Sequence, residues 1–292
     1  MITDDLLAAA QGVLPDVVEL RRDLHVHPEL GNHLPRTQGR VLEALDGLGL
    51  EISTGTALSS VVADLVGGAG DGPTILLRGD MDALPMPEDT GLDFASVVDG
   101  AMHACGHDAH TAMLVGAATV LAGRRDRLAG RVRFMFQPGE EGFGGATDMI
   151  DEGVLDGVDA AFALHVAPNM FSDFVIHRSG AALASADVVK VVVTGRGGHA
   201  SSPHWATDPV PVACEIVLAL QSMITRTVNA FDPAVLTIAQ LDAGTTDNVI
   251  PESAALTGTL RAVSEHTRHA VWASIDQVAQ GVAAAHGCTA TV

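Results

Sequence analysis

Two hydrophobic periods alternate along the first part of the chain. Short apolar runs rich in β-branched residues predict strands, and apolar residues spaced three or four apart predict helices. The predicted strands are residues 60–67, 73–80, 131–138 and 159–166, and the predicted helices are residues 16–27, 35–48, 109–123 and 145–155. Pro15 is expected to open the first helix, because proline is favoured in a first helical turn. The alternation predicts an α/β fold, with a mixed or parallel sheet covered by helices on both faces.

The pattern changes near residue 178. The rest of the chain predicts strands at residues 186–195, 234–244, 253–263 and 288–292, and helices at residues 209–224 and 265–286. The order β-α-β-β-α-β is typical of a ferredoxin-like α+β unit. We therefore expect two domains, residues 1–178 and residues 179–292. The last predicted strand has five residues and stands at the end of the chain, so we expect a C-terminally truncated chain.

Composition and charge exclude several classes of protein. The 292 residues are 47% hydrophobic and 18% charged, which is typical of a globular protein. A net charge of −20 argues against a nucleic-acid partner, because that affinity depends on Lys and Arg. The N-terminus is acidic, and no apolar run approaches the roughly 20 residues that span a bilayer. We therefore expect no membrane partner. Three widely spaced cysteines suggest no disulfide framework, so the chain is expected to be cytoplasmic.

Metal-binding residue types follow the predicted strands of the first domain. In an open α/β sheet, ligands collect at the carboxyl ends of strands. The candidates are Asp80, Asp82, Cys105, His107, Glu140, Glu141 and His165. Thiolate and imidazole groups suit zinc and its neighbours, and carboxylates extend the choice to manganese or cobalt. A carboxylate beside the metal can take a proton from water and pass it to a leaving amine.

Each candidate also has a purely structural interpretation. Cys105 alone is typical of a small buried apolar residue. His103 and His110 are explained equally well as helix caps or solvent-facing side chains. Asp80 has two structural explanations, an ion pair with Arg78 or a hydrogen bond from a backbone amide. The two adjacent glutamates resemble a solvated charge pair. The convergence of several ligand types on one sheet edge favours the metal interpretation.

Seven motifs in this order resemble one known family, the M20 metallopeptidases. They read "LHVHPELG", "LLRGDMDALP", "MHACGHDAHTAMLVGAA", "FMFQPGEEGFGGA", "ALHV", "GRGGHASSPH" and "DNVIPESAALTGTLR". The resemblance is strongest to the amidohydrolases that include hippurate hydrolase, N-acyl-amino-acid aminoacylases and auxin-conjugate hydrolases. It implies metal-dependent hydrolysis of the amide bond of N-acyl amino acids or similar small conjugates. It also implies that the second domain is a lid and dimerisation domain, and hence a homodimer.

The resemblance also implies the roles of individual residues. Two divalent ions, of zinc, manganese, cobalt or nickel, would be held by Cys105, His107, Glu141 and His165. Glu140 would be the general base and acid, and Asp82 would orient a metal ligand.

Three residues of the second domain would act on the substrate. His199 would donate a hydrogen bond to the tetrahedral oxyanion, and Asn248 and Arg261 would contact the substrate. The structural alternatives are a turn-capping asparagine and a surface arginine.

Two departures from the family pattern keep other functions open. The segment after "PELG" reads "NHLPRT" instead of carrying the usual glutamate, and a last metal-binding histidine of the family would lie beyond Val292. One alternative is therefore a non-catalytic or inactive metal-binding fragment. Another is a thiol enzyme with Cys105 as nucleophile and His107 as base, although residues two apart do not face each other on a helix.

Overall fold

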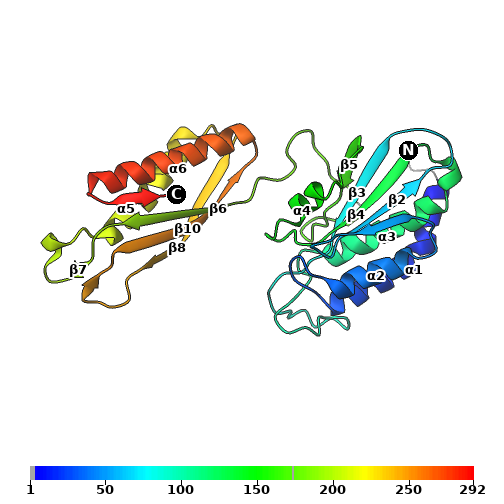
Figure 1. Cartoon of the computed structure of the whole chain (residues 1–292), viewed down its shortest axis with the longest axis horizontal. Helices are drawn as coiled ribbons and strands as arrows, with labels where there is room; N and C mark the ends of the chain where they lie inside the picture. The colour runs from blue at the N-terminus through cyan, green and yellow to red at the C-terminus, as the bar shows by residue number, and fades with distance from the viewer. Residues whose placement is uncertain (1–3, 173) are drawn as a thin grey trace. The chain divides into compact units, whose positions relative to one another are not determined.

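The described chain forms two compact units. The computed structural model describes residues 4–172 and 174–292, and they divide after Ser172 (Figure 1). Each unit has a hydrophobic core of its own. The boundary expected from the sequence, after residue 178, lies six residues further along the chain.

The first unit is built on a mixed five-stranded sheet in the order β1-β2-β4-β3-β5. Its helices are α1 (Asp4–Val26), α2 (Pro35–Leu45), α3 (His107–Ala122), the 3-10 turn η1 (Arg125–Arg127) and α4 (Gly145–Asp151). Its strands are β1 (Glu51–Thr54), β2 (Val61–Val66), β3 (Thr74–Asp80), β4 (Arg131–Gln137) and β5 (Ala160–Ala163). Strand β3 runs parallel to β4 and β5, while β1 and β2 are antiparallel to their neighbours. The expected α/β arrangement with a mixed sheet is confirmed.

Alternation along the strands gives this sheet two apolar faces. On β2, Val61, Ala63 and Leu65 belong to a core shared with α1, α2 and α3. The intervening Val62 packs against a second cluster, which contains Met149 of α4. Because successive side chains on a strand point to opposite faces, helices must cover both sides. Three helices cover one face and the short α4 covers part of the other.

The two largest differences from the predicted helix boundaries are at α1 and α4. The prediction that Pro15 opens the first helix is wrong, because α1 begins at Asp4 and contains Pro15. Val13 and Val17, on either side of this proline, both lie over Gly116 of α3, so packing favours a helix that continues through it. Helix α4 ends at Asp151, before Gly153, whose φ of +88° is incompatible with an α-helix.

Two strands of this unit also differ clearly from the prediction, and the short strands Gly198–His199 and Val249–Ile250 of the second unit were not predicted. Strand β1 was not predicted, because its four residues are all exposed and show no alternation. Strand β5 was predicted over residues 159–166 but ends at Ala163, which leaves His165 just beyond the sheet.

The second unit has an antiparallel sheet in the order β11-β6-β10-β8 and a small β7–β9 pair. Its strands are β6 (Asp187–Thr194), β7 (Gly198–His199), β8 (Ala234–Ala243), β9 (Val249–Ile250), β10 (Ser253–Ala262) and β11 (Thr289–Thr291). Its helices are the 3-10 turn η2 (Pro203–Trp205), α5 (Pro209–Thr227) and α6 (Glu265–Ala285). Val189, Val191 and Val193 of β6 pack in one core with apolar residues of both α-helices. The chain order β6-α5-β8-β10-α6-β11 is the ferredoxin-like order.

Helix α5 is, within the described residues, the helix that is long and apolar enough to span a membrane. Val212, Ile216 and Leu220 lie four residues apart and are buried in the core of the second unit. The opposite face carries polar residues such as Glu215 and Ser222, which are exposed. This amphipathic pattern is typical of a core helix.

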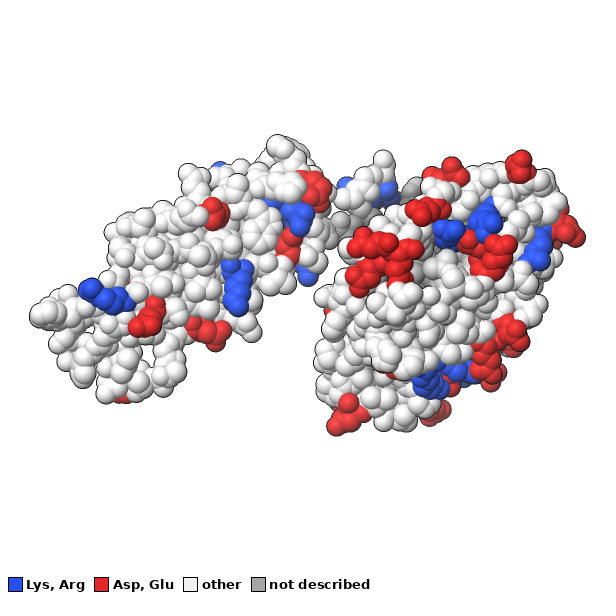
Figure 2. All heavy atoms as spheres, in the orientation of Figure 1, with Lys and Arg blue, Asp and Glu red and all other residues white. Residues whose placement is uncertain are grey.

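On the visible surface of the first unit, acidic side chains cover more area than basic ones, and most of the surface is uncharged (Figure 2). This distribution agrees with the net charge of −20. The visible face therefore offers little positive surface for a polyanion.

Leu256→Ala is expected to destabilise the second unit. Leu256 lies on β10, is fully buried and belongs to the core of this unit. Removing a buried leucine side chain costs about 2–5 kcal/mol, because it loses apolar burial and leaves a cavity. Chemical denaturation of the variant and its parent measures the difference. Leu218→Ala, at a side chain that is 71% exposed on α5, is the matched control. Equal losses for the two variants would contradict the assignment of this core.

Candidate metal centre

Three parallel strands place their carboxyl ends at one edge of the first sheet. Asp80 at the end of β3 is level with Gln137 at the end of β4, and Arg78 is level with Ala163 at the end of β5. The segments that follow these strands carry Asp82, the Glu140–Glu141 pair and His165. The N-terminus of α3 adds His107, with Cys105 just before it. The candidates of the first unit therefore come from four separate segments that meet at one edge.

His107 lies at the centre of this arrangement. Its side chain is completely buried. It takes part in three groups of potential metal ligands, and within each group the donor atoms lie within 4.8 Å of one another. The groups are Cys105–His107–His165, Asp80–His107–His110 and His107–Glu140–Glu141.

Four carboxylates surround the imidazole of His107. Asp82 Oδ1 lies 3.4 Å from Nδ1. The other nitrogen, Nε2, lies 3.6 Å from Asp80 Oδ2, 3.8 Å from Glu141 Oε1 and 3.9 Å from Glu140 Oε2. Burial opposes a charged imidazole, yet the nearby carboxylates of Asp82, Asp80 and Glu140 raise the pKa of His107. This surplus of negative charge favours a bound cation.

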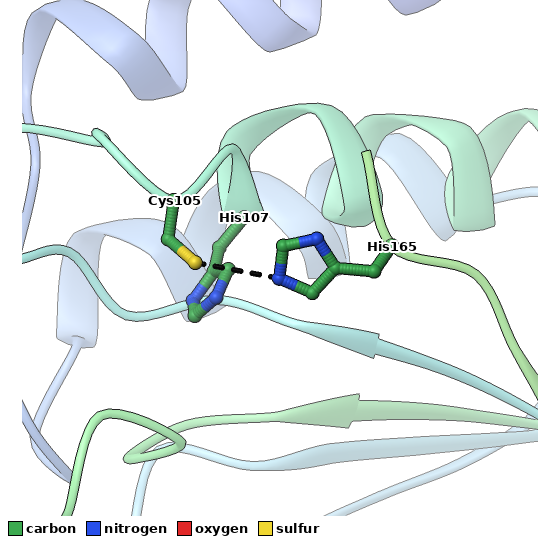
Figure 3. A group of neighbouring side chains, drawn as sticks. All are labelled: Cys105, His107 and His165. Carbon is green, nitrogen blue, oxygen red and sulfur yellow. Dashed lines mark hydrogen bonds between the residues drawn. The ribbon is translucent and has the colours of Figure 1, made fainter. Parts of the chain in front are cut away.

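Cys105 and His165 face each other beside His107 (Figure 3). Cys105 Sγ lies 3.3 Å from His165 Nε2. The other nitrogen of His165, Nδ1, lies 2.7 Å from the carbonyl oxygen of Val166 and donates to it. The lone pair of Nε2 therefore points toward the sulfur. Metal-binding histidines commonly use one nitrogen for the metal and donate with the other to an oxygen.

Asp82 binds the backbone of the two adjacent glutamates. The carboxylate oxygens of Asp82 accept hydrogen bonds from the backbone N–H of Glu140, at 2.9 Å, and of Glu141, at 3.0 Å. The Glu140 side chain is 42% exposed and that of Glu141 is 22% exposed. One dipeptide thus presents a more accessible and a more enclosed carboxylate to the same site.

Some polar atoms of this site are buried and have no hydrogen-bond partner within the part of the chain that the structure describes. Both ring nitrogens of His107 and the Oε1 atom of Glu141 are buried and have no hydrogen-bond partner among the described residues. Such atoms are rare in folded proteins and call for a ligand. Nitrogen, oxygen and sulfur donors together fit a divalent transition metal. The side chains present therefore fit such an ion.

Two histidines of the "MHACGHDAH" motif do not lie where their explanation as helix caps or solvent-facing side chains would put them. His103 and His110 are neither helix caps nor solvent-facing; both are buried. Burial lowers the pKa of His103 to about 4, so its ring is neutral. His110 lies 2.6 Å from Asp80 Oδ1, and Asp80 also forms an ion pair with Arg78. No local pattern predicts the contact between His110 and Asp80, because the two residues are thirty positions apart in the chain.

Asn32 is a contact that sequence reasoning missed. It lies in the unusual "NHLPRT" segment, and its Nδ2 atom donates to the carbonyl oxygen of Phe143 at 3.0 Å. Its Oδ1 atom occupies the space that a side chain at Gly139 would need. The loop that carries the two glutamates is therefore held by Asn32 as well as by Asp82.

In the second unit, two of the three candidates lie close together. His199 pairs with Val249 in the β7–β9 ladder, and the carbonyl of Asn248 accepts from the N–H of Ala200. His199 Nδ1 accepts from the backbone N–H of Ser201 at 3.2 Å, so the proton of the neutral ring is on Nε2. Arg261 is exposed near the far end of β10, where it pairs with Val235. The unit does not bring it to the other two.

Comparisons with known proteins identify the family to which this chain is similar. Residues 76–289 match the model of peptidase family M20/M25/M40. N-acetylcysteine deacetylase of Bacillus subtilis is 42% identical over 94% of this chain and 72% of its own length. N-acyl-L-amino acid amidohydrolase of Geobacillus stearothermophilus is 38% identical over 99% of this chain and 78% of its own length.

A solved structure of an M20 family member is also similar to this chain. The Bacillus subtilis YXEP protein, described as a dinuclear metal-binding peptidase of the M20 family, has a TM-score of 0.82 and 38% identity. The alignment covers 96% of this chain and 73% of that protein. Since the family match and the relatives extend over most of the sequence, the chain belongs to peptidase family M20/M25/M40.

Proposed function

We propose that the protein is a metal-dependent hydrolase of the amide bond in N-acyl amino acids or similar small amino-acid conjugates. The observation that carries this proposal is the meeting of thiol, imidazole and carboxylate donors around the buried His107. Relatives that are named as a deacetylase of N-acetylcysteine and an amidohydrolase of N-acyl-L-amino acids support the substrate class.

The proposed metal ligands are Cys105, His107, Glu141 and His165. Their donor atoms and the orphaned atoms of His107 and Glu141 support this choice. A relative described as dinuclear supports two ions, for which zinc, manganese, cobalt and nickel are the expected choices. When bound, such an ion polarises the substrate carbonyl and makes water more acidic.

Glu140 is the proposed general base and acid. Its carboxylate is the more exposed of the glutamate pair, so water and substrate can reach it. It takes a proton from the water molecule whose oxygen bonds to the amide carbon. When the carbon–nitrogen bond breaks, Glu140 returns that proton to the departing amine, so protons balance over the cycle. Asp82 is the proposed positioning residue, since it binds the N–H groups of both glutamates.

The second unit is the proposed lid and dimerisation domain. Nδ1 of His199 accepts from the backbone N–H of Ser201, so Nε2 is the nitrogen that can donate to the carbonyl oxygen as negative charge develops there. Asn248 and Arg261 are proposed to contact the substrate, and an arginine suits a substrate carboxylate. The homodimer and the cytoplasmic location stay predictions.

The alternatives are less well supported. In the thiol-enzyme hypothesis His107 is the base, yet the hydrogen-bond partner of Cys105 Sγ is His165. Burial and the negative charge of Glu141 raise the pKa of the Cys105 thiol to about 12, so without a cation it is not a ready nucleophile. The relatives are named as a deacetylase, a carboxypeptidase and an amidohydrolase, which favours hydrolysis over a non-catalytic role.

Glu140→Gln is expected to lower the rate of hydrolysis by about 10²–10⁴-fold, because glutamine keeps the shape but cannot take a proton. The assay measures amino acid released from a panel of N-acyl amino acids by protein loaded with zinc, manganese or cobalt. Calorimetry should show unchanged metal binding. Glu19→Gln, at an exposed position on α1, is the matched control. A near-parent rate for Glu140→Gln would remove this residue from the mechanism.

Chelators are expected to abolish hydrolysis, whereas alkylation of the metal-loaded protein is not. A metal bound to Cys105 occupies the sulfur and shields it from the reagent, while the exposed Cys214 reacts and serves as the internal control. Peptide mass spectrometry measures modification at each cysteine alongside activity. Rapid alkylation of Cys105 with metal still bound, accompanied by loss of activity, would favour the thiol enzyme instead.

A further inference from the structure

His110 connects two of the strand ends that form the metal centre. Its side chain is buried within α3. On one side, Nδ1 lies 2.6 Å from Asp80 Oδ1, at the end of β3. On the other side, Nε2 accepts a hydrogen bond of 2.9 Å from the backbone N–H of Val166, which follows β5. The ring also meets the ring of His165 edge-on, with centroids 4.7 Å apart.

These contacts fix the tautomer of His110. A backbone N–H can only donate, so Nε2 must accept with its lone pair. The proton of the neutral ring is then on Nδ1, where it is donated to Asp80. By distance alone, His110 could join Asp80 and His107 around a metal. Both nitrogens of His110 already form hydrogen bonds. An ion bound to His110 would therefore have to break one of these two buried hydrogen bonds.

Val166 links this histidine to three proposed ligands. Its carbonyl accepts from His165 Nδ1 at 2.7 Å, while its N–H donates to His110. Its side chain lies against Gly106, which separates Cys105 from His107. A Cβ at Gly106 would come within 2.3 Å of Val166 Cγ2, and the φ of this glycine is +85°. The position of Val166 therefore affects the two residues beside Gly106 as well as His165.

We propose that Asp80, His110 and Val166 form a positioning relay that aims His165 Nε2 at Cys105 Sγ. Asp80 orients the His110 ring, the ring holds the N–H of Val166, and the carbonyl of Val166 holds the ring of His165. His110 is a positioning residue and not a metal ligand. The inference rests on the proposed function, because the relay matters for activity only if His165 binds a metal.

His110→Phe tests the relay, since phenylalanine keeps an aromatic ring and removes both hydrogen bonds. Cobalt(II) is the probe, and its charge-transfer absorption with a thiolate reports binding at Cys105. Competition with a chelator gives the affinity. Loss of a group that orients a metal ligand typically weakens binding about 10–100-fold, and we expect that range together with altered visible bands.

A second variant separates positioning from general damage. In His110→Gln the side-chain oxygen can again accept from the N–H of Val166, so most of the cobalt affinity should return. His33→Gln, at an exposed position in the same unit, should bind cobalt like the parent. Thermal unfolding of each metal-free protein tests whether the fold itself has changed.

The outcomes distinguish this inference from the proposed function. A parent protein that binds cobalt without a thiolate band overturns the proposed ligand set, and the relay with it. A normal parent whose His110→Phe variant binds cobalt within twofold overturns the relay alone. A glutamine variant as weak as the phenylalanine variant, with an unchanged fold, also overturns it, because restoring the acceptor has no effect.

Nitrogen NMR tests the inference on the parent protein alone, so the result does not depend on whether a variant folds. His110 should carry its proton on Nδ1 and keep a bare Nε2 before and after zinc is added. The Nε2 signals of His107 and His165 should shift to those of metal-bound nitrogens. A metal-bound shift for either nitrogen of His110 overturns the inference.

Discussion

The site depends on four carboxylates that converge on one buried imidazole. Negative groups repel one another in an enclosed site, and an ionised group out of water is costly without a partner. The Arg78 guanidinium compensates Asp80, and backbone N–H groups compensate Asp82. Glu141 Oε1 and both nitrogens of His107 are left without a hydrogen-bond partner among the described residues. A divalent cation beside Glu141 would satisfy Oε1 and the Nε2 atom of His107, while Nδ1 of that ring faces Asp82 Oδ1 at 3.4 Å. The surrounding loops therefore fit a metal centre.

The same constraint explains how two neighbouring glutamates can act differently. Asp82 accepts both of their backbone N–H groups, so the dipeptide cannot rotate as a free loop. Gly139, with a φ of +64°, lets the chain turn immediately before them, and Asn32 fills the space beside it. With the backbone held, the two side chains keep different exposures, and one becomes the enclosed donor while the other remains open to water. Backbone support thus gives two chemically identical groups different access to solvent.

Much of this arrangement could be predicted from the sequence because it follows local rules. Short apolar runs located β2, β3 and β4, and the parallel strands bring their carboxyl ends to one edge. Helix α1 was mispredicted at Pro15, since the local signal of a proline is weaker here than the packing of Val13 and Val17 on Gly116. The role of His110 could not be predicted, because its partners lie on β3 and after β5 and no local pattern encodes them.

The two histidines proposed as ligands are held by different means, and this difference explains the need for His110. His107 begins a long helix and faces the carboxylate of Asp82, so its position follows from a rigid element. His165 lies beyond the end of a four-residue strand, where no ladder hydrogen bonds restrain it. An imidazole on such a segment loses conformational freedom when it binds a metal. Its neighbour Val166 is tied to His110 on one side and packed on Gly106 on the other. The restraint that regular structure gives to His107 is thus supplied to His165 by side chains.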